Sequence, residues 1–118
     1  MNKKTRNILL WVSRIIMGVG FLLASVGKLL HAPSIIKMFN EWGFPDQFYF
    51  LIGIIEIIGA ILLLIPKTSK YAALGLIGLM IGASITHMLN DPIVELIRPL
   101  IFLMFLGMIV YLSRRQTD

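Results

Sequence analysis

The chain contains no cysteine. This absence excludes a disulfide framework, a thiolate metal site and dithiol redox chemistry carried by the chain itself. Charged residues are also scarce, at 14% of 118 residues, whereas soluble domains average about 25%. Hydrophobic residues reach 58%, against about 45–50% in soluble domains. A water-soluble protein of this length could not bury so much apolar surface, so we expect lipid as the solvent and exclude a soluble enzyme.

The formal net charge is +5, but its distribution argues against nucleic acid as a partner. The basic residues flank apolar runs and do not form a patch interleaved with aromatic side chains. That arrangement is typical of membrane topology signals. The basic start of the chain resembles the first region of a signal peptide. The apolar run that follows is too long and contains Arg14, so we predict an uncleaved first span.

Four apolar runs are long enough to cross a membrane as helices, which takes about 20 residues each. They cover residues 8–30, 48–65, 71–89 and 93–112. The last two connections are very short, which forces neighbouring helices to be antiparallel. Because backbone groups in lipid must be satisfied within a segment, the runs predict helices and not strands. We therefore predict an all-α, integral membrane four-helix bundle, with residues 1–118 as a single four-span domain.

The distribution of basic residues predicts the orientation of the four spans. One side of the four-span model carries Lys3, Lys4, Arg6, Lys67, Lys70, Arg114 and Arg115. The opposite loops contain Lys37 as their clear basic residue, beside Glu41, Asp46 and Asp91. The positive-inside rule then places both termini in the cytoplasm. We expect a multi-pass protein of the cell membrane, most simply the bacterial cytoplasmic membrane.

The first outer loop, residues 31–47, has a helical pattern of its own. Pro33 suits a helix start and Gly43 a helix stop. Apolar side chains recur between them at helical spacing: Ile35, Ile36, Phe39 and Trp42. We predict a short amphipathic helix at the outer interface. It would serve as an aromatic anchor or as a lid over the outer end of the bundle.

Five charged residues interrupt the apolar runs: Arg14, Lys28, Glu56, Glu95 and Arg98. Ionisable groups at membrane depth are costly and often mark function. A rise of about 1.5 Å per residue places Arg14 in the cytoplasmic half and the others at mid-depth or in the outer half. His87 also lies at the outer end of its run. These six residues form the candidate ligand-binding set.

Glu56 is the most constrained of the set because its short side chain cannot reach an interface. It must be protonated, paired or next to water. Gly53 and Gly59 lie three residues away on either side, so we expect the carboxylate to face a neighbouring helix. Depth makes Arg98 its best partner, with Arg14 or Lys28 as alternatives. A purely structural ion pair and a ligand or proton site both fit this pattern.

The other charged residues have simpler interpretations open to them. Lys28, Glu95 and Arg14 could extend their side chains to the nearest interface. Pro99 lacks an N–H, so the carbonyl of Glu95 loses its helical partner, which predicts a bend beside Arg98. His87 is isolated from other metal-ligating residues, so we predict no metal site.

Several ordered segments are similar to a known family. They are Ser25-Val26-Gly27-Lys28-Leu29, Trp42-Gly43-Phe44-Pro45, Gly53-Ile54-Ile55-Glu56-Ile57-Ile58-Gly59-Ala60, and Pro66 at the end of the second span. In this order they resemble the DoxX and DoxX-like group of small four-helix membrane proteins. That group includes a small subunit of a thiosulfate:quinone oxidoreductase, maturation factors and eukaryotic assembly chaperones. The resemblance marks Lys28 and Glu56 as family landmarks, while the cysteines of some redox-active relatives are missing.

From these observations we expect an accessory subunit or maturation factor of a quinone-linked membrane redox system, and not a stand-alone enzyme. The chain would carry no built-in cofactor, and a quinone would bind near Glu56, Arg98 and Lys28. Its partners would be the lipid bilayer, a membrane oxidoreductase or a second copy of the chain. A proton-coupled small transporter is an alternative, although small multidrug exporters carry their essential carboxylate in the first helix. A purely structural or chaperone role is the other alternative.

Overall fold

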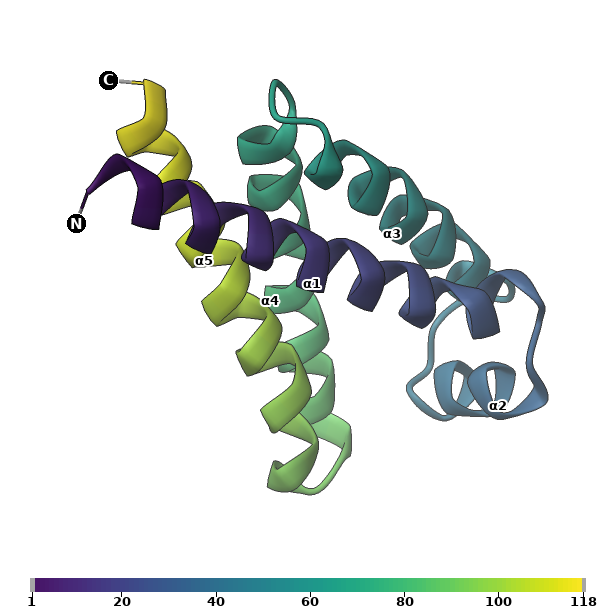
Figure 1. Ribbon diagram of the computed structural model, residues 1–118. Helices are drawn as coiled ribbons and strands as arrows, with labels where there is room; N and C mark the ends of the chain where they lie inside the picture. Colours follow the sequence, from purple (N-terminus) through teal and green to yellow (C-terminus); the bar gives the residue numbers. More distant parts are fainter. Residues whose placement is uncertain (1, 118) are drawn as a thin grey trace.

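The computed structural model describes residues 2–117, with side chains described as far as Ser113. Within that part the chain is all helical, without strands, as predicted (Figure 1). The elements in order are α1 (Lys3–Leu29), α2 (Pro33–Glu41), α3 (Phe48–Leu64), α4 (Ser69–Asn90), the 3₁₀ turn η1 (Ile93–Leu96) and α5 (Ile97–Thr117).

Local sequence signals account for most helix ends. The Asn2 side chain accepts a hydrogen bond from the Thr5 backbone N–H at 2.8 Å and so caps α1. Pro33 occupies the first position of α2, where its missing N–H costs nothing. Beyond α2, Gly43 has φ +84°, a left-handed conformation that glycine adopts without strain. Pro66 follows α3, and the residue before it is extended.

Three helical segments are long and apolar enough to cross a membrane: Lys3–Leu29, Ser69–Asn90 and Ile93–Ser113. The fourth apolar helix, α3, has 17 residues and is shorter. All four coincide with the apolar runs identified in the sequence. A short helix also occupies the loop before α3, beginning at Pro33 as predicted.

The expected bend at Pro99 takes a different form. The irregularity precedes the proline, as the 3₁₀ turn η1, and α5 begins at Ile97. Pro99 is thus in the first turn of α5, where a helix tolerates a missing N–H. The prediction of a bend within the helix was wrong because the helix starts here and does not continue through.

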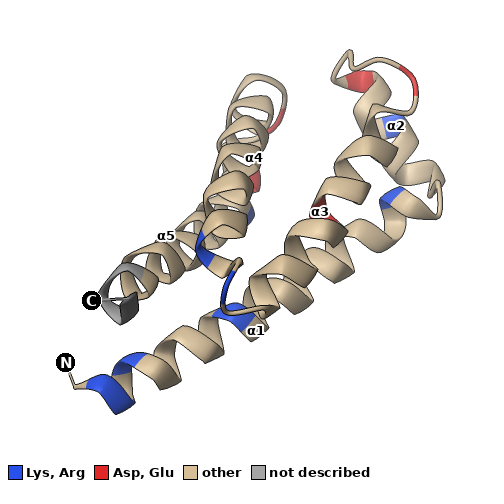
Figure 2. Cartoon of the chain, turned by 90° about the horizontal axis from the view of Figure 1, so that it is seen from above, with Lys and Arg blue, Asp and Glu red and all other residues tan. Residues whose placement is uncertain are grey.

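The helices form two antiparallel pairs, α1 with α3 and α4 with α5 (Figure 1). The pairs pack against each other through α1–α5 and α3–α4 contacts and then diverge. We call the end with both termini and the α3–α4 connection the terminal end, and we call the two separate tips that carry α2 and η1, taken together, the distal end (Figure 1). Figure 2 shows basic segments near the N-terminus and the α3–α4 connection and acidic segments in the distal loops, with further basic segments on α2 and the distal part of α1.

One core joins the four long helices where the pairs meet. Its fully buried members include Leu10, Phe21, Ala60, Leu63, Ala73, Leu106 and Ile109. At the distal limit of this contact, the ring of Phe21 meets the ring of Phe102 edge to face, with 5.1 Å between centroids. Toward the distal end α1 and α5 diverge (Figure 1).

Candidate functional site

Glu56 forms an ion pair with Lys28 between α1 and α3. The distance from Lys28 Nζ to Glu56 Oε1 is 3.0 Å, and the side chains are 14% and 4% exposed. Lys28 Nζ also donates a hydrogen bond to the Ala24 carbonyl at 3.1 Å. The lysine side chain therefore points toward α3 and does not extend away to an interface. The predicted interior position of Glu56 is confirmed.

The preferred partner of Glu56 was wrong, since Lys28 takes the place expected for Arg98. Depth along a helix does not say which neighbour a side chain faces. Helix α3 packs directly on α1, and a Cβ added to Gly53 would lie 2.9 Å from the Lys28 Cβ. That close approach of the two backbones leaves the lysine as the cation next to Glu56.

Arg14 lies at a separate buried position nearer the terminal end. Its residue is 1% exposed, and Nε donates to Ser69 Oγ at 3.0 Å. The guanidinium also lies over the Trp11 ring, 5.0 Å from its centroid. Within the described residues, no carboxylate lies within 4.0 Å of it. Arg14 therefore ties α1 to the start of α4 and does not extend to an interface.

Arg14 and Lys28 do not belong to one site. Fourteen residues of α1 separate them, which corresponds to about 21 Å of helical rise. The serine partner of Arg14 could not be found from sequence, because its contact spans 55 positions of the chain.

Glu95 and Arg98 are exposed and line a pocket of about 360 Å³. The remaining lining residues are apolar: Val94, Ile97, Ile101 and Phe102. The two charged side chains form no ion pair or hydrogen bond with each other or with other described residues. This pocket is distinct from the buried Lys28–Glu56 pair.

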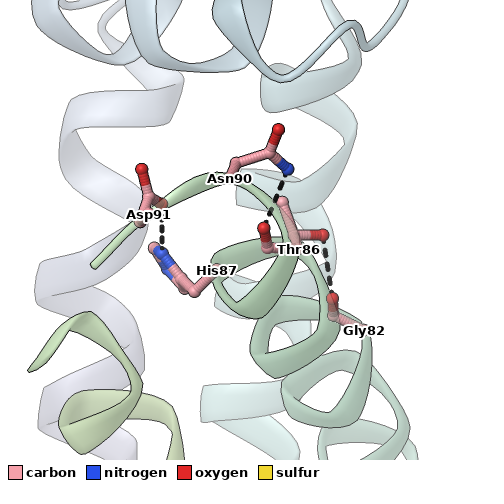
Figure 3. Close-up of polar contacts among 5 residues, drawn as sticks. All are labelled: Gly82, Thr86, His87, Asn90 and Asp91. Atoms are coloured by element: carbon pink, nitrogen blue, oxygen red, sulfur yellow. Dashed lines mark hydrogen bonds and ion pairs between the residues drawn. The ribbon is translucent and has the colours of Figure 1, made fainter. Parts of the chain in front are cut away.

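His87 forms part of a polar cluster at the distal end of α4 (Figure 3). Its Nδ1 lies 2.7 Å from Asp91 Oδ2, one helical turn later. The His87 imidazole also contacts the Trp42 ring edge to face, with 5.1 Å between centroids. This contact links the loop after α2 to α4. The i,i+4 spacing of His87 and Asp91 is a sequence signal that could have revealed their pairing.

Aromatic side chains gather around the α2 helix and the start of α3. Phe39 is the centre of this cluster, in contact with Trp42, Phe44, Phe48 and Tyr49. The neighbouring His31 is hydrogen-bonded through Nδ1 to the Tyr49 hydroxyl at 2.7 Å, and its ring stacks on Phe50. These contacts hold α2 against the α1–α3 pair.

The six candidate residues thus divide among four places. Lys28 and Glu56 form a buried pair, Arg14 lies toward the terminal end, Glu95 and Arg98 line the pocket, and His87 pairs with Asp91. Among the side chains that the structure describes, no cluster of three or more metal-ligating residues was found. The Lys28–Glu56 pair between α1 and α3 is the best candidate site, because both of its charged side chains have low exposure.

Comparison with known proteins identifies one family. The model of the DoxX-like family matches residues 12–109, a range that includes Lys28 and Glu56. No curated protein matched the chain, and no solved structure matched it.

Proposed function

This chain belongs to the DoxX-like family, and from that premise we propose that it is an accessory or assembly subunit of a quinone-linked membrane redox system. The observation that carries this proposal is the Lys28–Glu56 ion pair, buried between two apolar helices. A carboxylate and a cation at such depth are costly, and they are typically kept for a binding or proton-handling task. The absence of cysteine favours a supporting role over thiol chemistry.

The proposed subunit crosses the bilayer four times, through α1, α3, α4 and α5. Helix α3 rises about 26 Å over its 17 residues, close to the hydrocarbon thickness of about 30 Å. The basic terminal end would face the cytoplasm by the positive-inside rule, with α2 at the outer interface. The side chains of Arg114 and Arg115, which contributed to the sequence count, lie outside the described residues.

Lys28 has the chemistry to hold a carbonyl oxygen beside Glu56. An ammonium group has three N–H donors, and the structure shows one hydrogen bond, to the Ala24 carbonyl, beside the 3.0 Å ion pair with Glu56 Oε1. Lys28 Nζ has no other partner among the described residues, and its side chain is 14% exposed, so a ligand oxygen could reach it. A quinone would supply two-electron, two-proton chemistry to the complex. Lys28 would orient its carbonyl, and Glu56 would hold or release a proton next to it.

A purely structural or chaperone role is the second candidate, because the same ion pair fastens α1 to α3. A proton-coupled transporter has less support. Its carboxylate must meet water in turn on each side of the membrane, whereas the Glu56 side chain is 4% exposed and paired.

The test is purification of the tagged protein from native membranes in mild detergent, with mass spectrometry of bound proteins and extracted quinones. Glu56→Gln removes the charge while preserving shape. Glu41→Gln, at an exposed position on α2, is the matched control. We expect Glu56→Gln to reduce the retained quinone or partner about tenfold, the loss expected for one charge-assisted hydrogen bond.

The abundance of each variant separates the two candidates. Equal abundance with lost retention supports the ligand-linked role. A parallel fall in abundance and retention supports the structural role. Equal abundance with unchanged retention in Glu56→Gln would remove Glu56 from the function altogether.

A further inference from the structure

The pocket beside η1 and the first turns of α5 has two opposite charges on an apolar wall. Glu95 and Arg98 are both exposed, three residues apart, and their side chains have no partner among the described residues. The neighbouring side chains are also exposed, with Ile97 at 54% and Val94 at 58%. In a bilayer, unpaired charges beside exposed apolar side chains favour a polar partner from outside the chain.

The position of the pocket, combined with the proposed orientation, assigns it to one leaflet of the membrane. Phe102 forms one wall and contacts Phe21 of α1, at the limit of the contact between the helix pairs. The pocket therefore lies where α5 begins to separate from α1, and its charged residues lie toward the distal end. In the proposed orientation, that is the outer leaflet at headgroup depth.

The order of the charges fits one class of headgroup. Glu95 lies in the 3₁₀ turn η1 and precedes Arg98 by about 5 Å of helical rise, so the carboxylate is nearer the outer surface and the guanidinium is deeper. A phospholipid in the outer leaflet has its phosphate deeper and its amine further out. The two side chains thus match a zwitterionic headgroup in sign and in order.

We propose that this pocket binds a phospholipid with a phosphoethanolamine headgroup. Arg98 donates hydrogen bonds to the phosphate, a geometry that guanidinium favours. Glu95 accepts hydrogen bonds from the primary ammonium. Ile97, Ile101 and Phe102 contact the glycerol and the upper acyl chains, and the volume of about 360 Å³ suits a bound headgroup. The proposal rests on the orientation in the proposed function and not on a redox partner.

Other occupants fit the charges less well. An anionic headgroup without an amine would place its phosphate at Arg98 but leave Glu95 without a cationic partner. A choline headgroup has no N–H to donate. A second copy of the chain would have to pair Glu95 and Arg98 reciprocally, and the same measurement detects it as a dimer.

The first test uses the unmodified protein and needs no substitution. Native mass spectrometry in mild detergent would compare equal additions of phosphatidylethanolamine, its N-methyl and N,N-dimethyl derivatives, phosphatidylcholine and phosphatidylglycerol. We expect retention to fall as methyl groups replace N–H donors, with about a tenfold preference for the unmethylated lipid over choline. Equal retention across the series, or a preference for phosphatidylglycerol, would overturn the proposal, as would a dimer without bound lipid.

Variants then assign the two charges. Arg98→Gln is expected to lower retention of every phospholipid, whereas Glu95→Gln is expected to remove only the preference within the methylation series. The double exchange Glu95→Arg with Arg98→Glu keeps the net charge but reverses the order, so the ethanolamine preference should disappear. Lys37→Gln, at an exposed position on α2, is the control and should change nothing. Retained selectivity in the double exchange would contradict the proposal.

The outcome is independent of the redox partner. Lipid selectivity without co-purifying quinone or oxidoreductase would leave this proposal intact and contradict the proposed function. Co-purification of quinone or an oxidoreductase without lipid selectivity would support the proposed function and contradict the lipid proposal.

Discussion

The Lys28–Glu56 pair shows an asymmetry between its two members. Lys28 lies in the last turn of α1, and a long flexible stem lets it reach water if its partner is lost. Glu56 lies in the middle of α3 on a short stem, 4% exposed. Removal of the lysine therefore leaves a buried carboxylate without compensation, while removal of the carboxylate leaves a cation with an alternative. The cost of breaking the pair depends on which residue is changed.

A double-mutant cycle measures this asymmetry. We expect Lys28→Met to lower the free energy of unfolding by about 3 kcal/mol, the cost of leaving a buried charge unpaired. Glu56→Gln should cost about 1 kcal/mol or less. The combined Lys28→Met and Glu56→Gln variant should be more stable than Lys28→Met alone, because no unpaired charge remains. Equilibrium unfolding in mixed micelles provides the values, and strictly additive losses would contradict this account.

Sequence reasoning reached the burial of Glu56 but not its partner. The short carboxylate side chain and the glycines around it were sufficient to predict an interior position. The choice of Arg98 relied on depth, which follows from helical rise. The choice between cations depended on which helix packs next to α3, and this is decided by contacts between residues far apart in sequence.

At the level of the elements, close packing of α1 on α3 brings the ion pair together. Gly53 is the point of approach, since an added Cβ would lie 2.9 Å from the Lys28 Cβ and 3.3 Å from the Leu29 side chain. The first of these contacts is near the backbone, so it cannot be relieved by a rotamer change. Small residues at such positions allow helices in lipid to approach closely.

Gly53→Ala should therefore force α1 and α3 apart. We expect a loss of about 1–3 kcal/mol in the free energy of unfolding, the usual cost of overpacking, together with weaker quinone or partner retention. Gly78→Ala is the matched control, because an added Cβ on α4 meets nothing within 4 Å. Both variants can be compared by thermal unfolding in detergent. Equal stability of the two would show that the close approach is not tightly packed.

Element boundaries were largely predictable because they depend on local chemistry. The apolar runs, the proline at the start of α2 and the proline after α3 all gave ends close to those observed. Pro99 was misjudged because a proline inside a long apolar run fits both a bend and a helix start. The turn at η1 decides between them, and its formation depends on the short connection from α4.

At the scale of the whole molecule, two helix pairs meet at the terminal end and diverge toward the distal end (Figure 1). The Trp42–His87 contact connects the α2 loop to α4 at the distal end, while the pocket with Glu95 and Arg98 lies beside α5. Composition could predict the number of apolar helices but not this divergence. The angle between pairs depends on which side chains interlock in the shared core.

In the proposed topology four helices cross the membrane, and the Lys28–Glu56 pair lies toward the outside. Helix α3 is the critical element of this topology because, with 17 residues, it is the shortest of the four apolar helices. The absence of native cysteine allows single-cysteine labelling without a background. Suitable exposed positions are Thr5, Asp46, Lys67 and Asn90, which lie in four different segments.

The most direct measurement is reaction of these single-cysteine variants with a membrane-impermeant maleimide added to intact cells. We expect Asp46→Cys and Asn90→Cys to react at once, and Thr5→Cys and Lys67→Cys to react only after the membrane is permeabilised. Reaction of Asp46→Cys and Lys67→Cys from the same side would contradict this topology, because α3 would then not cross the bilayer.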